Sequence, residues 1–192
     1  KANFGVHITM HKGYAPGSGL GSSGASAAGA AFAMNKLLDD KYDNLALTKF
    51  AMYGEKMACG EAIADNVAAA IYGGFVLVRS YDPLDIIKLP TPKNLRVVAI
   101  HPQIEIRTED ARKVLPDTIK LEDAITQWAN VGGLVSGLHT KDYELISRSL
   151  NDVIVEPYRK KLIPHFDAVK KAALKAGALG AGISGSGPTM FA

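Results

Sequence analysis

The chain has 192 residues, of which 47% are hydrophobic and 21% are charged, and its formal net charge is +3. This composition is typical of a soluble globular protein with one large or two small domains, and the small, scattered charge argues against nucleic-acid binding. The single cysteine, Cys59, excludes an internal disulfide and suits a reducing compartment. The sequence contains no signal peptide and no bilayer-length apolar run. We therefore expect a cytoplasmic protein without a nucleic-acid or membrane partner.

Both ends of the sequence read as cut. Lys1 leads almost directly into a strand-like segment, and residues 188–192 resemble a strand that has only begun. We therefore expect further sequence on both sides.

The first half of the chain mixes extended and helical patterns. Residues 5–10 alternate apolar and polar side chains, which predicts a half-buried strand. A glycine- and serine-rich loop then runs into an alanine-rich helix, and the polar cluster at 39–44 ends that helix. Asp43 or Asn44 can cap the next helix, which is expected over residues 45–57. A strand is predicted over residues 75–79, and the turn-rich residues 80–83 follow it before the stretch at 86–89.

Pro90 and Pro92 mark the best linker in the chain, because proline interrupts both helices and strand ladders. Beyond them, Thr108 reads as the N-cap of a short helix that ends before Pro116. The remaining expected elements are strands over 95–101 and 177–183, helices over 122–138, 142–150 and 165–175, and a second glycine–serine turn at 184–189. The chain is thus predicted to be a mixed α and β protein in two halves.

Three residues outside these patterns have simple interpretations. His101 stands at a strand end before a proline and is expected to be structural. Trp128 is expected to pack between helices or at a dimer face, and Cys59 is expected to be a small buried residue.

The loop at residues 16–26 has the chemistry of an anion site. Glycines allow tight turns and close backbone approach, and the start of a helix offers unbonded N–H groups and partial positive charge. A Walker-type phosphate loop would need a lysine that is absent here. A dinucleotide fingerprint fits Gly19, Gly21 and Gly24, but lacks the second strand and its acidic residue. A plain turn before a buried helix also fits the loop taken alone.

Two motifs together identify a family resemblance. Residues 16–26 resemble the ATP-binding motif of the GHMP superfamily, named after galactokinase, homoserine kinase, mevalonate kinase and phosphomevalonate kinase. Residues 182–189 are similar to its third motif, a glycine turn that packs near the phosphate loop. The stretches 55–66, 101–116 and 156–164 resemble the homoserine kinases within that superfamily.

The resemblance implies an α+β fold with two domains, residues 1–90 and 91–192, and an active site in the cleft between them. It also implies a homodimeric enzyme that uses ATP and Mg²⁺ to phosphorylate the side-chain hydroxyl of L-homoserine. Two alternatives stay open. The chain can be a GHMP kinase for another small alcohol, or a non-catalytic relative that binds a nucleotide or metabolite.

For the nucleotide, the resemblance implies a cradle made by the whole first motif. Ser23 and Glu55 would hold Mg²⁺, whose preferred ligands are hard oxygens, and Ser22 would bond phosphate or cap the helix. The implied nucleotide-binding residues are Pro16, Gly17, Ser18, Gly19, Leu20, Gly21, Ser22, Ser23, Gly24, Ala25 and Ser26.

For the acceptor, the resemblance implies that Arg112 and Arg159 bind the substrate carboxylate and that Asn66 hydrogen-bonds the substrate. Catalysis would rest on positioning and charge stabilisation without a dedicated base. The implied catalytic residues are Ser23, Glu55, Thr108 and Arg112. Relatives commonly carry a histidine where Ile63 stands, and this departure keeps both alternatives open.

Overall fold

The structure of the chain is a computed structural model that describes residues 4–192, apart from the side chains of residues 58 and 59. The prediction for Cys59 therefore lies outside the described side chains. The chain divides into two compact units. The first comprises the residues up to Pro16 and Gly21–Lys88, and the second comprises Gly17–Leu20 and Leu89–Ala192. In the described part of the chain, no helix combines the length and apolar character that a membrane crossing requires.

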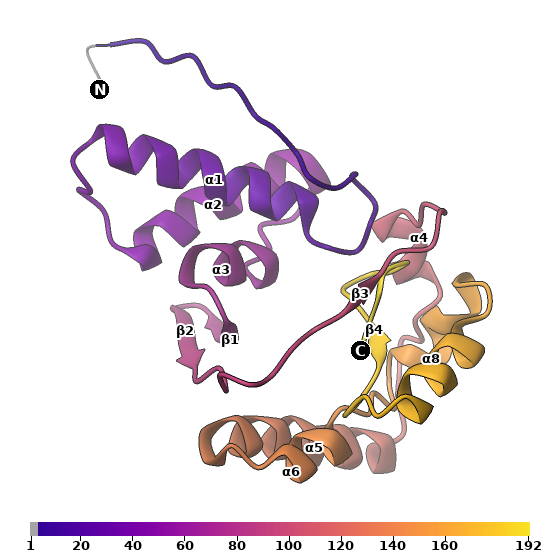
Figure 1. The fold of residues 1–192 in the computed structure, drawn as a ribbon. Helices are drawn as coiled ribbons and strands as arrows, with labels where there is room; N and C mark the ends of the chain where they lie inside the picture. The colour runs from indigo at the N-terminus through magenta and orange to yellow at the C-terminus, as the bar shows by residue number, and fades with distance from the viewer. Residues whose placement is uncertain (1–3) are drawn as a thin grey trace. The chain divides into compact units, whose positions relative to one another are not determined.

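Three helices form the body of the first unit, namely α1 (Ser22–Leu37), α2 (Asn44–Cys59) and α3 (Asp65–Tyr72) (Figure 1). Their shared core contains Ala28, Ala51 and Val67. The helices approach closely because small residues meet at their contact: a Cβ on Gly54 of α2 would lie only 2.8 Å from the Cβ of Ala27 on α1. A two-stranded sheet of β1 (Phe75–Tyr81) and β2 (Leu84–Leu89) follows α3.

Two polar side chains fix the turn between α1 and α2. Asp43 caps α2, as predicted, because its carboxylate accepts a hydrogen bond from the backbone N–H of Ala46 at 2.8 Å. Asn35, buried near the end of α1, donates to the C=O of Tyr42 and accepts from the N–H of the same residue. The helix that follows the glycine loop is therefore held at both its packed face and its far end.

The predicted strand at residues 5–10 is not present in the structure. This segment belongs to no sheet, and the side chains of Phe4, Val6, Ile8 and Met10 are exposed. A strand exists only when a neighbour completes its hydrogen-bond ladder, and no described segment does so here. The alternating sequence pattern therefore gave the wrong element for this region.

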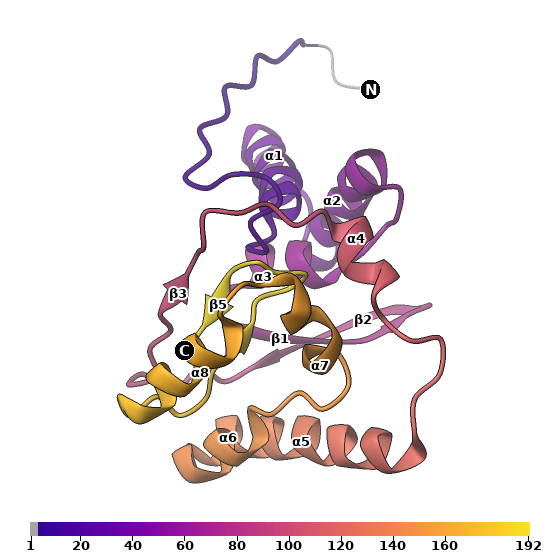
Figure 2. The same ribbon diagram turned by 90° about the vertical axis from the view of Figure 1, so that its right-hand side faces the viewer.

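The second unit is built around a three-stranded antiparallel sheet with the order β3-β5-β4, formed by β3 (Ala99–Ile100), β4 (Gly182–Ile183) and β5 (Met190–Phe191). The strands are shorter than the predicted ones at 95–101 and 177–183. The helices are α4 (Thr108–Lys113), α5 (Leu121–Thr140), α6 (Tyr143–Ser149), α7 (Glu156–Arg159), the 3₁₀ turn η1 (Lys160–Leu162) and α8 (Phe166–Lys175) (Figure 2).

The core of the second unit joins the sheet to two of these helices. Met190 of β5 packs with Phe166 of α8 and Ala111 of α4, together with Ile106 and Ile163. The predicted N-cap of α4 is wrong: Arg107 occupies that position, and Thr108 is the first helical residue. This shift matters because α4 carries two of the residues expected to act in catalysis.

The long helix α5 pairs with α6 through glycine. A Cβ on Gly137 would lie 2.8 Å from the Cγ1 of Ile146, so the two helices are in close contact there. Trp128 of α5 is 65% exposed, so it does not pack between helices of the described chain, and its place at a dimer face stays a prediction.

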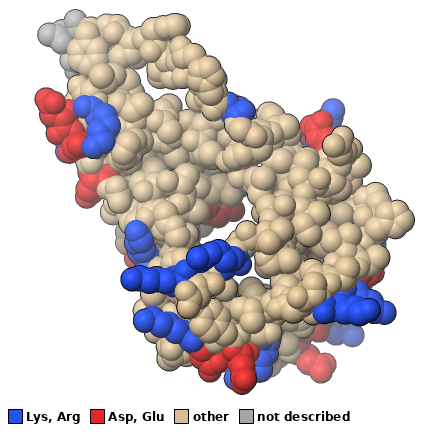
Figure 3. All heavy atoms as spheres, in the orientation of Figure 1, with Lys and Arg blue, Asp and Glu red and all other residues tan. Residues whose placement is uncertain are grey.

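On the face drawn in Figure 3, basic and acidic side chains form small groups separated by uncharged surface.

Candidate nucleotide and acceptor site

The glycine loop has a backbone that other residues could not adopt without strain. Gly17, Gly19 and Gly21 have φ angles of +72°, +78° and +67°. Two of them also lack room for a side chain. A Cβ on Gly19 would lie 2.6 Å from the carbonyl oxygens of Ser184 and Gly187, and one on Gly21 would lie 2.7 Å from the Oδ1 of Asn66. Glycine at these positions is therefore required by the backbone of the loop and by the protein groups that pack against it.

Backbone N–H groups and two serine hydroxyls at or near the start of α1 are available to bind a ligand. Gly21 is the N-cap and has no side chain to bond the first N–H groups, so Ser22 does not cap the helix and that part of its prediction is wrong. The Oγ atoms of Ser18 and Ser22 are buried and have no hydrogen-bond partner among the described residues. A buried hydroxyl without a partner costs about 1–3 kcal/mol. Such atoms fit a loop whose hydrogen-bonding needs are met by a ligand.

Ser23 and Glu55 meet, although they come from different helices. The Oγ of Ser23 donates to the Oε2 of Glu55 at 3.2 Å, and Glu55 is only 4% exposed. One hydroxyl and one carboxylate suit Mg²⁺, which keeps several water or phosphate oxygens in its coordination shell. The described residues contain no group of three or more His, Cys, Asp or Glu that could form a metal cage. The pair therefore fits a cation shared with a phosphate group better than a closed protein site.

Asn66 lies against the same end of the loop. It is the second residue of α3, and a Cβ on Gly24 would lie 2.7 Å from its own Cβ. Its side chain is exposed, and its backbone N–H donates to the carboxylate of Asp65 at 2.6 Å. In the first unit, the structure thus brings together the start of α1, Glu55 and Asn66.

A cavity of about 320 Å³ in the first unit borders the same helix start. It lies between residues 8–14 and α1, and Lys12, Tyr14, Ser22 and Ser26 are among the residues that line it. Sequence reasoning missed Lys12 and Tyr14. The signal was available, because both residues lie within four positions of Pro16, where the glycine loop begins.

The second glycine turn contacts the first part of the loop within the second unit. The Oγ of Ser184 donates to the C=O of Gly19 at 2.8 Å, and the N–H of Thr189 donates to the C=O of Ser18 at 3.2 Å. Ser184 and Gly19 are 165 positions apart in the sequence. The expected packing of one glycine turn near the other is present in the structure.

The two arginines expected to bind a carboxylate lie near each other in the second unit. Arg159 donates from Nε to the C=O of Ala111 at 3.1 Å and from Nη1 to the C=O of Gly185 at 3.0 Å. Burial lowers the pKa of Arg159, the carboxylate of Asp152 opposes this, and the charge of Arg112 adds to it. An arginine stays protonated at neutral pH even so. Thr108 lies one turn before Arg112 on α4.

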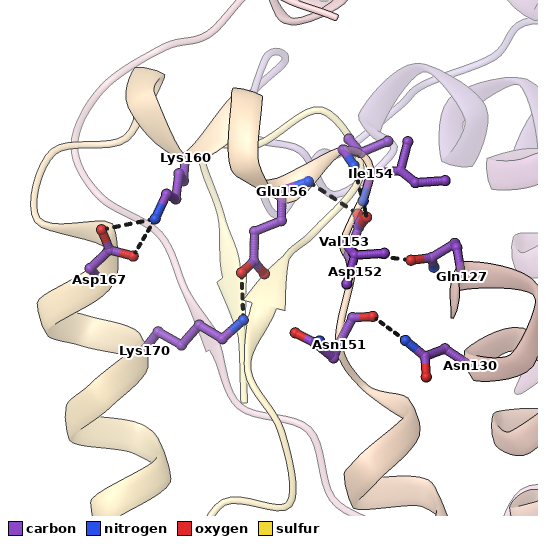
Figure 4. A network of polar contacts seen from close by, with 11 residues as sticks. Gln127, Asn130, Asn151, Asp152, Val153, Ile154, Glu156, Lys160, Asp167 and Lys170 are labelled. Atoms are coloured by element: carbon purple, nitrogen blue, oxygen red, sulfur yellow. Dashed lines mark hydrogen bonds and ion pairs between the residues drawn. The ribbon is translucent and has the colours of Figure 1, made fainter. Parts of the chain in front are cut away.

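Sequence reasoning missed the short helix that carries Arg159. Asp152 holds its start, since its carboxylate accepts hydrogen bonds from the N–H groups of Ile154, Val155 and Glu156 (Figure 4). A partly buried ion pair between Glu156 and Lys170 connects the same helix to α8. An aspartate a few residues before Pro157 was the available signal, because proline favours the first turn of a helix.

Comparison with known proteins shows to which family the chain belongs. The profile for the GHMP kinases N terminal domain matches residues 1–74, and the profile for the GHMP kinases C terminal matches residues 134–192. A homoserine kinase from Chlorobium phaeobacteroides is 54% identical over 187 residues, which is 97% of this chain and 58% of the relative. One from Thermococcus gammatolerans is 45% identical and is covered over 63% of its length.

Solved structures agree with these relatives. The crystal structure of homoserine kinase from Cytophaga hutchinsonii matches with a TM-score of 0.91 and 59% identity over 94% of this chain and 57% of that one. A protein from Listeria monocytogenes shares the fold alone, with a TM-score of 0.68 and 23% identity. The chain spans 58% of the length of the Chlorobium relative. With both domain profiles in order and an α+β structure of the same fold, the chain belongs to the GHMP kinase family.

Proposed function

We propose that this chain carries the catalytic residues of a homoserine kinase, which transfers the terminal phosphoryl group of ATP to the side-chain hydroxyl of L-homoserine. The observation that supports this most strongly is the 54% identity to a homoserine kinase over 97% of the chain. The site residues are compatible with it, because phosphoryl transfer needs positioning and charge stabilisation more than covalent chemistry.

In this proposal the glycine loop and the start of α1 bind the triphosphate. The unbonded N–H groups at the helix start favour a negative charge, and the partnerless hydroxyls of Ser18 and Ser22 would each gain a phosphate acceptor. The cavity lined by Lys12, Tyr14 and Ser26 has room for the nucleoside, and Lys12 supplies positive charge beside it. The residues 16–26 then act together as the nucleotide cradle.

Ser23 and Glu55 would hold Mg²⁺. When bound, Mg²⁺ supplies the positive charge that offsets the charge developing on the transferred group. Glu55 is suited to this task because α2 holds its carboxylate in a buried position and Ser23 orients one of its oxygens. The helix start contributes further partial positive charge from the backbone.

Arg112 and Arg159 would bind the carboxylate of the acceptor, because two guanidinium groups near each other favour an anion. Asn66 would hydrogen-bond the acceptor, and Thr108 would stand beside Arg112 where the hydroxyl reacts. No carboxylate or histidine is assigned the role of a base, so the rate would depend on positioning and on charge stabilisation. The homodimer and the cytoplasmic location remain predictions that sedimentation and cell fractionation can test.

The test is turnover on L-homoserine compared with mevalonate and galactose, followed as ADP release. We expect turnover on L-homoserine alone. Turnover on another alcohol only would replace the proposed substrate and keep the kinase.

One residue favours a second candidate, a relative that binds nucleotide without catalysis. Ile63 stands three residues before Asn66, and its aliphatic side chain cannot hydrogen-bond a substrate. The variant Glu55→Gln separates the two candidates. A kinase loses turnover, whereas a binding protein has no turnover to lose and shows only weaker metal-dependent binding of nucleotide.

A further inference from the structure

A hydrogen bond joins His101 to Thr189 at the edge of the sheet in the second unit. The Nδ1 of His101 lies 2.9 Å from the Oγ1 of Thr189. The register of the antiparallel strands explains this contact. Ala99 pairs with Phe191 and Ile100 with Met190, so His101, just after β3, comes opposite Thr189, just before β5. Thr189 is fully buried, while His101 is exposed. In this hydrogen bond His101 is therefore the solvent-exposed partner and Thr189 the buried one.

The backbone of Thr189 is hydrogen-bonded to the glycine loop and to the second glycine turn. Its N–H donates to the C=O of Ser18 at 3.2 Å, and its C=O accepts from the N–H of Ser184 at 2.8 Å. Ser184 in turn donates from Oγ to the C=O of Gly19 at 2.8 Å. The carbonyl groups of two consecutive loop residues are thus both held by the second glycine turn.

Holding these carbonyls fixes the direction of two N–H groups. In a trans peptide the C=O of one residue and the N–H of the next point in opposite directions within one rigid plane. The bond to the C=O of Ser18 therefore orients the N–H of Gly19, and the bond to the C=O of Gly19 orients the N–H of Leu20. Both N–H groups therefore point away from the donors that hold the two carbonyls, and in the proposed function they face the phosphates.

We propose that His101 is a positioning residue for nucleotide binding, acting through the hydroxyl of Thr189 on the loop at Ser18 and Gly19. The inference rests on the proposed function, since it takes that loop to bind the phosphates of ATP. His101 itself touches no nucleotide. Its role is to anchor the side chain of Thr189, which restrains the backbone of that residue and so keeps the donated N–H in place at the C=O of Ser18.

The test compares substitutions that keep or remove the polar atom at the Nδ1 position. An asparagine places its amide near that position, whereas a leucine of similar size has no polar atom there, and a glutamine places its amide nearer Nε2. We expect His101→Leu and His101→Gln to weaken binding of Mg·ADP by isothermal titration calorimetry about fivefold, the scale of one lost hydrogen bond. We expect His101→Asn to stay within about twofold of the parent protein.

Thr189 supplies the second half of the test. Thr189→Val keeps the shape and the N–H but removes the hydroxyl, so it is expected to weaken binding as His101→Leu does, and Thr189→Ser to leave it nearly unchanged. Because both positions act through one bond, the double variant should lose about fivefold and not about 25-fold. KM for ATP is expected to rise while KM for L-homoserine stays constant, a split that general loss of packing would not produce.

His139→Leu is the matched control, because His139 is an exposed histidine at the end of α5 in the same unit. Additive losses in the double variant, or binding by His101→Leu equal to that of the parent protein, would overturn the inference and leave the proposed function intact. Equal losses in His101→Asn and His101→Leu would also overturn it. Failure of the parent protein itself to bind Mg·ADP would instead refute the proposed function, and the inference with it.

Discussion

The Oγ of Ser23, in the first turn of α1, donates a hydrogen bond to the Oε2 of Glu55, which lies 3.2 Å away on α2. The packing of α1 on α2 through alanine and glycine brings these residues together across 32 positions of sequence. A carboxylate that is 4% exposed carries a desolvation cost, so its position beside a helix start and a hydroxyl is significant. This relationship leads to the first prediction.

Glu55→Gln is expected to lower kcat by about 10²–10³-fold, the scale of losing one charge-stabilising group, because the amide keeps the shape but not the charge. Raising the Mg²⁺ concentration should recover part of the loss. Steady-state kinetics across a range of Mg²⁺ concentrations provides the measurement. Glu122→Gln on the exposed first turn of α5 is the control, and an unchanged kcat in Glu55→Gln would remove Glu55 from the proposed metal site.

Ser18→Ala and Ser22→Ala are expected to change stability and binding in opposite directions. Each removes a buried hydroxyl without a partner, so without nucleotide the free energy of unfolding should rise by about 1 kcal/mol. Binding of ATP should weaken about five- to tenfold, since the hydroxyls are proposed to bond phosphate. Urea unfolding and calorimetry measure the two effects. A loss of stability in both variants would show that these hydroxyls are satisfied within the protein.

Gly19→Ala is expected to lower the free energy of unfolding by at least about 2 kcal/mol and to abolish nucleotide binding. Its φ of +78° disfavours a side chain, and the new Cβ would lie 2.6 Å from two backbone carbonyl oxygens that cannot move aside cheaply. Gly132→Ala is the matched control in the same unit, because nothing lies within 4 Å of its Cβ position inside α5. That control should gain up to about 1 kcal/mol in urea unfolding.

Arg159→Lys is expected to raise KM for L-homoserine about tenfold or more while KM for ATP changes little. Lysine keeps the charge, but it cannot donate to the carbonyls of Ala111 and Gly185 at the same time in the geometry of the planar guanidinium group. Initial-rate kinetics with each substrate varied in turn tests this. A rise confined to KM for ATP would mean that Arg159 serves the glycine turn alone.

Asp43→Ala is expected to lower the free energy of unfolding by about 1 kcal/mol without changing KM for either substrate. The substitution removes the hydrogen bond that caps α2, and the site residues lie elsewhere on the helices. Thermal unfolding and initial-rate kinetics measure the two quantities. A large loss of activity would instead mean that the start of α2 controls the position of Glu55.

Local signals predicted most of the helices, because the information that specifies a helix lies largely within its own segment, although α3 and α7 were not predicted. The apolar spacing of residues 45–57 and the capping aspartate before them are sufficient to specify α2. The segment at 5–10 failed for the opposite reason, since a strand depends on a partner elsewhere. The four-residue helix α7 was missed because Asp152 and the ion pair of Glu156 with Lys170 hold it, and helical periodicity does not show in so short a segment.

The candidate site shows the same difference between local features, which the sequence predicts, and long-range contacts, which it does not. The glycine loop could be recognised from its own residues, and the meeting of Ser23 with Glu55 came from a family resemblance. The bond of Thr189 to Ser18 joins residues nearly at opposite ends of the chain, so no local pattern contains it. The buried hydroxyls of Ser18 and Ser22 needed the structure as well, because burial depends on what packs over a residue.

Formation of O-phospho-L-homoserine from ATP and L-homoserine, detected by ³¹P NMR and mass spectrometry, is the decisive measurement. We predict that the product forms with one ADP released per molecule, that it requires Mg²⁺, and that Glu55→Gln nearly abolishes it. If the protein binds both ATP and L-homoserine and yet forms no phosphorylated product at saturating concentrations, the proposed kinase activity is wrong.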